Sequence, residues 1–304
     1  QDRSSAASDV YKRQAWQWAG DSTAKETLSG LMEQISASDR IQLRCGTRAV
    51  GCYGDQLVGL VDEKRLTKLR AKAILIATGC IEQPAVFQNN DLPGVMLGSA
   101  AQRLISLFAV KPFDRAVVLA ANSDGYRAAL DLQSAGVNVS AIVDLRHEGE
   151  PSEPGQAVVD QNIPVHKGHA IYEARPARGK KRIRGAVLCP LNSDGTLRSE
   201  TRRVIDCDGI AMSVGWSPNG GLIYQAGGRF SHSENIEQLM PSELPTGVFA
   251  AGRVNGVFAL DDQIDDGFRA GLSAAQFLGR YEGEIPESVL HLSLIHISEP
   301  TRPL

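Results

Sequence analysis

Residues 115–146 read RAVVLAANSDGYRAALDLQSAGVNVSAIVDLR, and this stretch decides the fold. The apolar run 115–121 is typical of a buried parallel strand. A turn follows at Asn122, Ser123 and Asp124, and either Ser123 or Asp124 can cap the helix that comes next. The stretch therefore begins as a strand that passes through a capped turn into a helix.

The second half of the stretch completes a βαβ unit. An apolar stripe at helical spacing predicts a helix that ends at Gly136. The stripe consists of Tyr126, Ala129, Leu130 and Leu132. Residues 137–143 then form a second buried strand, which Asp144 closes about 20 residues after the turn. A dinucleotide-binding unit keeps the carboxylate that binds a ribose at that position.

The phosphate turn of such a unit reads G-x-G-x-x-G, and its three glycine positions fall on Ala120, Asn122 and Gly125. Only the third glycine, which lets the helix pack on the strand, is present. Ala120 is small, and Asn122 tolerates a left-handed backbone better than most residues. Two interpretations stay open: a turn with less room for a pyrophosphate, and a βαβ unit without a ligand.

The composition is that of a globular protein with a normal core. The chain has 304 residues, 42% of them hydrophobic, and a net charge of −3. No apolar run reaches membrane-spanning length, and the mild acidity argues against nucleic acid as the main partner. The five cysteines show no C-x-x-C spacing, which indicates a reducing compartment, and we expect a cytoplasmic protein.

Both ends of the sequence look foreign. Residues 9–14, DVYKRQ, and 293–304, SLIHISEPTRPL, resemble translated sequencing-adapter read-through. We therefore expect 1–14 and 292–304 to be adapter-like tails and the chain to be an internal fragment.

Glycines at the ends of two buried strands indicate a domain that another domain interrupts. One strand, 72–77, runs into Thr78-Gly79 before the βαβ unit, and another, 247–251, runs into Gly252 long after it. The predicted fold is α/β, with two Rossmann-like FAD/NAD(P)-binding domains, the second inserted in the first, and a β-rich segment. The predicted boundaries are 15–110 and 241–291 for the first, incomplete domain and 111–240 for the inserted NAD(P)-type domain.

Helices and strands are expected along the rest of the chain. The expected helices are 15–36, 99–108, 155–161 and 261–280, and the expected strands are 41–53, 56–62, 66–70, 165–173, 182–190, 197–205 and 209–213. Residues 217–221, SPNGG, are expected to break the chain. The segment 175–184, RPARGKKRIR, carries six basic side chains, which indicate either a solvated hairpin or a phosphate site.

Two strand ends carry candidate cofactor contacts. Gly79 lets a backbone approach a dinucleotide without a side chain between them. The stretch 246–260, TGVFAAGRVNGVFAL, leads past Gly252 into a long helix, whose N-terminus favours a pyrophosphate. Flavoproteins usually have Asp after that glycine to bond ribitol. Here Arg253 follows, which cannot accept a ribitol hydroxyl but can bind phosphate bidentately.

Other polar residues suggest no catalytic group and no metal site. Asp261, Asp262, Asp265 and Asp266 are interpreted as favourable charge near a helix start rather than as metal ligands. Cys80 is interpreted as a buried thiol, and the histidines show no zinc spacing.

Four segments together resemble the α subunit of heterotetrameric sarcosine oxidase, over about residues 41–282. They read KAILIATGCIEQPAVFQNNDLPGVMLGSAAQRL (72–104), VVLAANSDGYRAALDL (117–132), DGIAMSVGWSPN (208–219) and GVFAAGRVNGVFALDD (247–262). The family motif ERP-x-VF-x-NND-x-PGVM is specific and falls on 82–96, with Gln83 in place of the usual Arg.

The resemblance implies a subunit of a complex that oxidises sarcosine to glycine and forms hydrogen peroxide. It implies NAD in this subunit, FAD and FMN in or against the β subunit, and γ and δ subunits as further partners. It also implies tetrahydrofolate binding through a C-terminal domain that is not in this sequence. The amine substrate would bind on a partner chain. Carried over by position, the residues around NAD are Ala49, Thr78, Gly79, Gly252, Arg253, Phe258 and Leu260.

Other functions remain in competition. The chain resembles, within the same group, a subunit of hydrogen cyanide synthase or of another amine dehydrogenase, and a non-catalytic dinucleotide-binding scaffold is a further alternative. A stand-alone disulfide reductase would need a paired redox cysteine motif, which the sequence lacks. We expect NAD in the first domain only, and we expect the chain by itself to lack amine oxidase activity.

Overall fold

The computed structural model of the chain describes residues 22–148, 152–179, 181–198, 200–234 and 236–287. These residues divide into two compact units. Unit 1 contains the described residues of 1–81 and 217–293, and unit 2 contains 82–216, so unit 2 is inserted in the sequence of unit 1. Residues 1–14 and 292–304, which we expect to be adapter-like tails, lie outside the described residues.

The units divide the chain earlier than the predicted boundaries at 110/111 and 240/241. Unit 2 begins before β6 (Val95–Leu97) and α3 (Gly98–Phe108), because both pack on its central sheet. The second segment of unit 1 begins at Ser217, before the hairpin of β15 (Arg229–Ser233) and β16 (Gln238–Glu243). The hairpin belongs to unit 1 because β16 packs against the 3-10 turn η2 (Gly252–Asn255).

A five-stranded parallel sheet forms the centre of unit 2, in the order β6-β13-β7-β8-β9. Its other strands are β7 (Arg115–Ala120), β8 (Asn138–Asp144), β9 (Val165–Lys167) and β13 (Gly209–Ser213). The strands predicted over 115–121, 137–143 and 209–213 are therefore confirmed, and the fold is the predicted α/β class.

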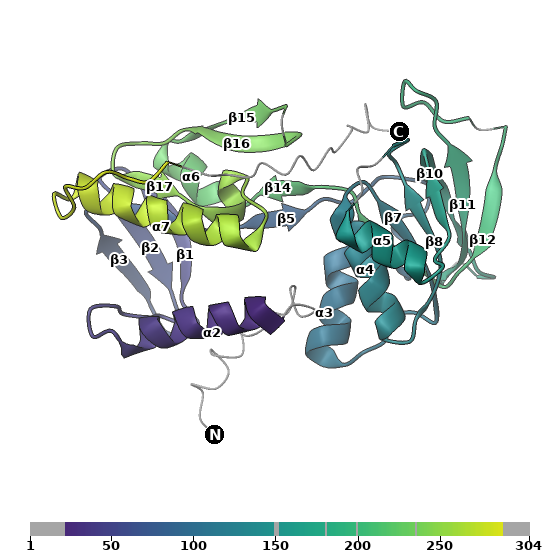
Figure 1. Cartoon of the computed structure of the whole chain (residues 1–304), viewed down its shortest axis with the longest axis horizontal. Helices are drawn as coiled ribbons and strands as arrows, with labels where there is room; N and C mark the ends of the chain where they lie inside the picture. Colours follow the sequence, from purple (N-terminus) through teal and green to yellow (C-terminus); the bar gives the residue numbers. More distant parts are fainter. Residues whose placement is uncertain (1–21, 149–151, 180, 199, 235, 288–304) are drawn as a thin grey trace. The chain divides into compact units, whose positions relative to one another are not determined.

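Alternate side chains of β7 enter two separate cores, as strand geometry requires. Ala116, Val118 and Ala120 belong to the core under the helices, whereas Val117 and Leu119 belong to the core under a three-stranded antiparallel sheet. The helices are α3, α4 (Ser123–Ser134) and α5 (Glu153–Asp160), and the antiparallel strands are β10 (His169–Pro176), β11 (Ile183–Pro190) and β12 (Arg203–Asp206). Unit 2 thus has three layers, with the parallel sheet in the middle (Figure 1).

Unit 1 is built around a parallel pair, β4 (Ile74–Ile76) and β17 (Val248–Ala250). Its core contains Ile76, Ile223, Val248, Ala250 and Val254. The remaining elements are α2 (Ser22–Ala37), β1 (Arg48–Tyr53), β2 (Leu57–Val61), β3 (Leu66–Arg70), α6 (Gly221–Ala226) and α7 (Leu260–Phe277). Two short strands, β5 (Cys80–Glu82) and β14 (Trp216–Pro218), pair where the sequence passes between the units.

The structure corrects four sequence predictions. The strand predicted over 41–53 begins only at Arg48. The strand predicted over 165–173 is two strands, because Gly168 adopts a left-handed backbone with φ of +61°. The strand predicted over 197–205 starts only at Arg203, since Leu197 forms an isolated bridge with Leu191 around a turn. The predicted break at 217–221 holds the end of β14 and the start of α6. No described helix is long and apolar enough to cross a membrane.

Candidate functional site

The turn between β7 and α4 is built by Asn122. Its backbone is extended, and its Oδ1 accepts a hydrogen bond from Gly125 N at 3.2 Å, so Asn122 caps α4. The predicted caps were Ser123 and Asp124. Asp124 instead accepts a hydrogen bond from Trp216 Nε1 at 2.9 Å. An asparagine is as good a cap as either, and it simply precedes them by one position.

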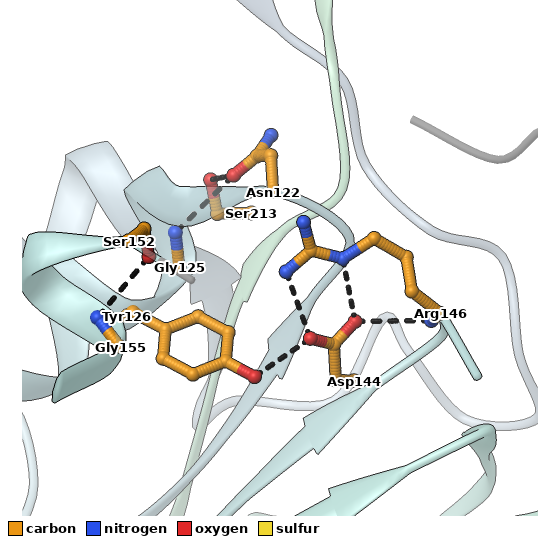
Figure 2. A network of polar contacts seen from close by, with 8 residues as sticks. All are labelled: Asn122, Gly125, Tyr126, Asp144, Arg146, Ser152, Gly155 and Ser213. Carbon is orange, nitrogen blue, oxygen red and sulfur yellow. Dashed lines mark hydrogen bonds and ion pairs between the residues drawn. The ribbon is translucent and has the colours of Figure 1, made fainter. Parts of the chain in front are cut away.

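Asn122 is also shut off from solvent. The side chain is 1% exposed, and Ser213 Oγ donates to its Oδ1 at 3.4 Å (Figure 2). Its Nδ2 has no partner among the described residues. A ligand would have to displace the turn to reach that nitrogen, because no surface of the residue is open.

Gly125 fills the packing role predicted for the third glycine of the motif. A Cβ built on it would lie 2.5 Å from Ala120 Cβ, which is closer than two carbons can approach. The space that a side chain at Gly125 would occupy is therefore already filled, because α4 packs directly on β7 there. It leaves no room for a cofactor at that point.

Asp144, the predicted ribose carboxylate, lies at the end of β8 and is fully buried. Its Oδ2 accepts from Tyr126 Oη at 2.7 Å and from Arg146 Nη2 at 2.8 Å. Its Oδ1 accepts from Arg146 N and Arg146 Nε, both at 3.0 Å. Figure 2 shows the side chains of Tyr126 and Arg146 directed at the Asp144 carboxylate. A carboxylate offers about four lone-pair sites, so these bonds leave none for a ribose hydroxyl.

The ionisation of this network follows from burial and pairing. Burial, and then the hydrogen bond to Asp144, raise the pKa of the Tyr126 hydroxyl, which stays a donor at neutral pH. Burial acts to lower the pKa of Arg146, but the hydrogen bond and charge of Asp144 outweigh it and raise that pKa. The ion pair is largely buried from solvent, with side-chain exposures of 13% for Arg146 and 0% for Asp144.

The second candidate is the strand-end site of unit 1, which we define as residues 77–80 and 251–255. The two segments lie together because β4 and β17 are parallel neighbours, with Ala250 opposite Ile76. Both strands therefore end at the same edge of the sheet. Thr78 Oγ1 donates to Asn219 O at 2.7 Å, and Asn219 N donates to Gly79 O at 2.9 Å. These bonds fix the turn that follows β4.

Both glycines of the strand-end site have left-handed backbones, with φ of +73° at Gly79 and +74° at Gly252. A Cβ built on Gly79 would meet nothing within 4 Å, and one on Gly252 would meet only Gln263 Oε1 at 4.0 Å. The backbone at these two turns therefore faces open space within unit 1, in contrast to Gly125.

Asp266 on α7 holds the turn after β17. Its buried carboxylate accepts from Gly252 N at 2.7 Å and from Asn255 Nδ2 at 3.3 Å. The sequence interpretation placed Asp266 in an acidic patch and missed this role. Helical spacing gave a signal, because Asp266 lies four residues before Ala270, which is buried on the same helix.

Arg253 and Phe258 come together at the strand-end site. The Arg253 guanidinium carbon lies 5.4 Å from the centre of the Phe258 ring, and its Nη1 lies 4.0 Å from Cys80 Sγ. Leu260 begins α7, whose first turn carries Asp261 and Asp262. Ala49 lies on β1 in the separate antiparallel sheet. The structure thus groups Thr78, Gly79, Gly252, Arg253 and Phe258 around one sheet edge.

The cysteines and the metal-ligating side chains add no further centre. All five cysteines are free. Burial raises the pKa of the Cys207 thiol to about 12, which leaves it protonated. In the part of the chain that the structure describes, no three His, Cys, Asp or Glu side chains gather as metal ligands.

Comparisons of sequence find similarity to subunits of sarcosine oxidase and of hydrogen cyanide synthase. It is 26% identical to sarcosine oxidase subunit alpha of Corynebacterium sp. (strain P-1), over 72% of this chain and 22% of that protein. It is 29% identical to the subunit of the same name from Rhizobium meliloti (strain 1021), over 65% of this chain and 20% of that protein. It is 26% identical to hydrogen cyanide synthase subunit HcnB of Pseudomonas aeruginosa, over 66% of this chain and 46% of that protein.

These relatives are much longer than the matched region, since the chain spans about a fifth of the sarcosine oxidase subunits. No protein-family model matches the sequence. The predicted resemblance to the sarcosine oxidase α subunit is nevertheless confirmed, and the chain resembles an oxidoreductase subunit.

Comparisons of structure confirm the fold. An L-proline dehydrogenase from P. horikoshii superposes with a TM-score of 0.63 at 18% identity, over 86% of this chain and 46% of that one. A thioredoxin reductase from T. acidophilum gives 0.59 at 18% identity, over 84% and 79%. Bacillithiol disulfide reductase from Bacillus cereus gives 0.60 at 17% identity, over 85% and 78%. The α/β fold predicted from sequence is shared with these oxidoreductases.

Proposed function

We propose that the chain forms the NAD-holding part of an oxidoreductase subunit of the sarcosine oxidase type, and that NAD binds at the strand-end site of unit 1. One observation carries the proposal. The glycines at Gly79 and Gly252 face open space, whereas a Cβ on Gly125 in unit 2 would lie 2.5 Å from Ala120. A dinucleotide needs close approach to the backbone, and of the two candidate sites the unit 1 turns are the ones that leave space for it.

Arg253 is the proposed phosphate-binding residue. Asp266 already accepts the hydrogen bond of Gly252 N, so a phosphate at this turn would rely on side-chain donors. The guanidinium group has five N–H donors in a planar fork that suits phosphate oxygens. Phe258 lies beside it and restricts its orientation. Asp266 is then a positioning residue, since it fixes the turn from which Arg253 extends.

The remaining predicted contacts, Ala49, Thr78 and Leu260, belong to the same proposal. When bound, NAD supplies a hydride acceptor. We place no catalytic residue in this chain, and the amine would react on a partner chain that carries or contacts FAD and FMN. The β, γ and δ subunits and a folate-binding domain complete the proposed complex. The support is that the relatives are named as subunits of larger enzymes.

A second candidate is a subunit of the hydrogen cyanide synthase type. It is favoured by the similarity to HcnB, of which this chain spans 46%. The strand-end site would have the same function in both complexes. The two candidates therefore differ in the chemistry of the partner chain, and a non-catalytic dinucleotide-binding scaffold is the limiting case in which the partner holds every cofactor.

The test is to assay the chain alone and then co-expressed with a candidate flavin-bearing partner chain. We expect no sarcosine-dependent peroxide from the chain alone and peroxide from the complex. Cyanide released instead of peroxide would select the second candidate. Turnover of sarcosine by the chain without a partner would contradict the proposed division of labour.

A further inference from the structure

A cavity of about 420 Å³ opens in unit 2 at the amino ends of the parallel strands. Its lining includes Arg115 at the start of β7, Arg182 and Arg184 around the start of β11, and Asp206 and Asp208. Ligand pockets commonly have volumes of about 300–1,000 Å³, so a small molecule of several heavy atoms fits. The basic segment 175–184 supplies two of its three arginines.

The hairpin of β10 and β11 fixes two of the arginines on one side. Ile183 is 1% exposed and inserts into the core, and its N donates to Pro93 O at 3.2 Å. Ala177 N donates to Arg182 O at 2.8 Å and closes the hairpin. Because side chains alternate along a strand, Arg182 and Arg184 both extend away from the core side that Ile183 occupies. Both reach the cavity without any change of the backbone.

The acidic residues at this cavity are mostly satisfied by other groups. Asp208 accepts hydrogen bonds from Arg115 N at 2.7 Å and Asp114 N at 3.2 Å. Asp114 itself pairs with Lys111 Nζ at 2.8 Å. The lining carboxylate that remains is Asp206, whose side chain makes no hydrogen bond to a described residue.

The arginines, by contrast, keep their donors available. Among the residues that the structure describes, no carboxylate forms an ion pair with Arg115, Arg182 or Arg184. Three guanidinium groups and three carboxylates line the cavity, and Lys111 compensates the charge of Asp114, so four cationic and three anionic side chains leave a net charge of +1. The net positive charge favours an anion, and guanidinium forks whose donors are available bind phosphate oxygens bidentately.

We propose that this cavity binds a small molecule that carries phosphate groups, held by Arg115, Arg182 and Arg184. The cavity shares no residue with either dinucleotide candidate. It lies at the Asn138 end of β8, whereas Asp144 closes the other end, about 20 Å away for a seven-residue strand. The proposal is therefore independent of where NAD binds.

The test is calorimetric titration of inorganic pyrophosphate into the chain in a phosphate-free buffer of low ionic strength. We expect saturable binding of one equivalent. Arg182→Gln and Arg184→Gln should each weaken it at least about fivefold, in line with the loss of a charged hydrogen bond. The matched control is Arg178→Gln, on the same hairpin but outside the cavity lining, and it should stay within about twofold of wild type.

Further arms make each outcome decisive. Arg253→Gln should leave pyrophosphate binding within about twofold, and a larger loss would assign the binding to unit 1. Equal weakening by Arg178→Gln would reduce the effect to general surface charge and overturn the site. Citrate that binds where pyrophosphate does not would overturn the phosphate class. Circular dichroism of each variant shows that it is folded, and absence of saturable pyrophosphate binding to the wild-type chain would refute the proposal.

Discussion

Replacement of Arg146 by methionine tests whether Asp144 depends on its own chain. Arg146→Met keeps the aliphatic stem and the backbone hydrogen bond from Arg146 N, but it removes the donors Nε and Nη2. A fully buried carboxylate then keeps only Tyr126 Oη and one backbone amide as partners. Removing one partner of a buried ion pair costs about 3–5 kcal/mol, because the remaining charge is uncompensated.

The assay is urea unfolding followed by circular dichroism. For a slope of about 1–3 kcal/mol/M, the expected loss moves the midpoint by at least about 1 M. The matched control is Arg103→Met on the exposed face of α3, which should change the free energy of unfolding by no more than about 0.5 kcal/mol. The double variant Asp144→Asn/Arg146→Met should recover at least half of the loss, since it removes the buried charge.

An Arg146→Met protein within about 1 kcal/mol of wild type would refute this reasoning. It would mean that the charge of the buried Asp144 carboxylate does not depend on Arg146 for compensation. The double variant distinguishes loss of the ion pair from nonspecific destabilisation by methionine. Nonspecific destabilisation would make the loss in free energy of unfolding larger in the double variant than in Arg146→Met, not smaller.

Two further predictions concern unit 2. Gly125→Ala should destabilise the chain by about 1–3 kcal/mol, because the new Cβ would overlap Ala120. The control Gly271→Ala, on α7 of unit 1 with open space around it, should stabilise the chain by up to about 1 kcal/mol. Equal midpoints of the two variants in urea unfolding would contradict this prediction. Burial raises the pKa of the Glu82 carboxyl, although its hydrogen bond from Ser99 N at 2.9 Å acts the other way. A raised folded-state pKa means that stability is lost as pH rises above about 4.3, so Glu82→Gln should gain on wild type from about pH 4 to pH 7 in urea unfolding. A relative loss over that range would show that Glu82 is stabilised as an anion.

The core of unit 2 could be predicted closely from sequence because its signals are local. The predicted strand 115–121 differs from β7 by one residue, since a run of buried apolar side chains ends at a polar turn. The hairpin of β15 and β16 was missed for the opposite reason. Its strands carry mostly polar or exposed residues and pair with each other rather than with a core sheet.

The candidate sites were predictable only where a glycine follows a buried strand. Gly79 and Gly252 could be placed at one sheet edge on that basis, and parallel pairing of β4 and β17 brings them there. The closure of Asp144 was not predicted, because it needs Tyr126 and Arg146 to meet in three dimensions. The spacing of two between Asp144 and Arg146 was visible in the sequence, but spacing alone does not distinguish an internal ion pair from a ligand contact.

The binding of NAD at the strand-end site is tested by titration of NAD into wild type, Arg253→Glu and Asp144→Asn, with circular dichroism as the check on folding. We expect Arg253→Glu to weaken NAD binding by about 1–3 kcal/mol, the range for losing a charged hydrogen bond, and Asp144→Asn to leave the affinity within about twofold of wild type. Strong loss in Asp144→Asn with unchanged binding by Arg253→Glu would place NAD in unit 2 and contradict the account.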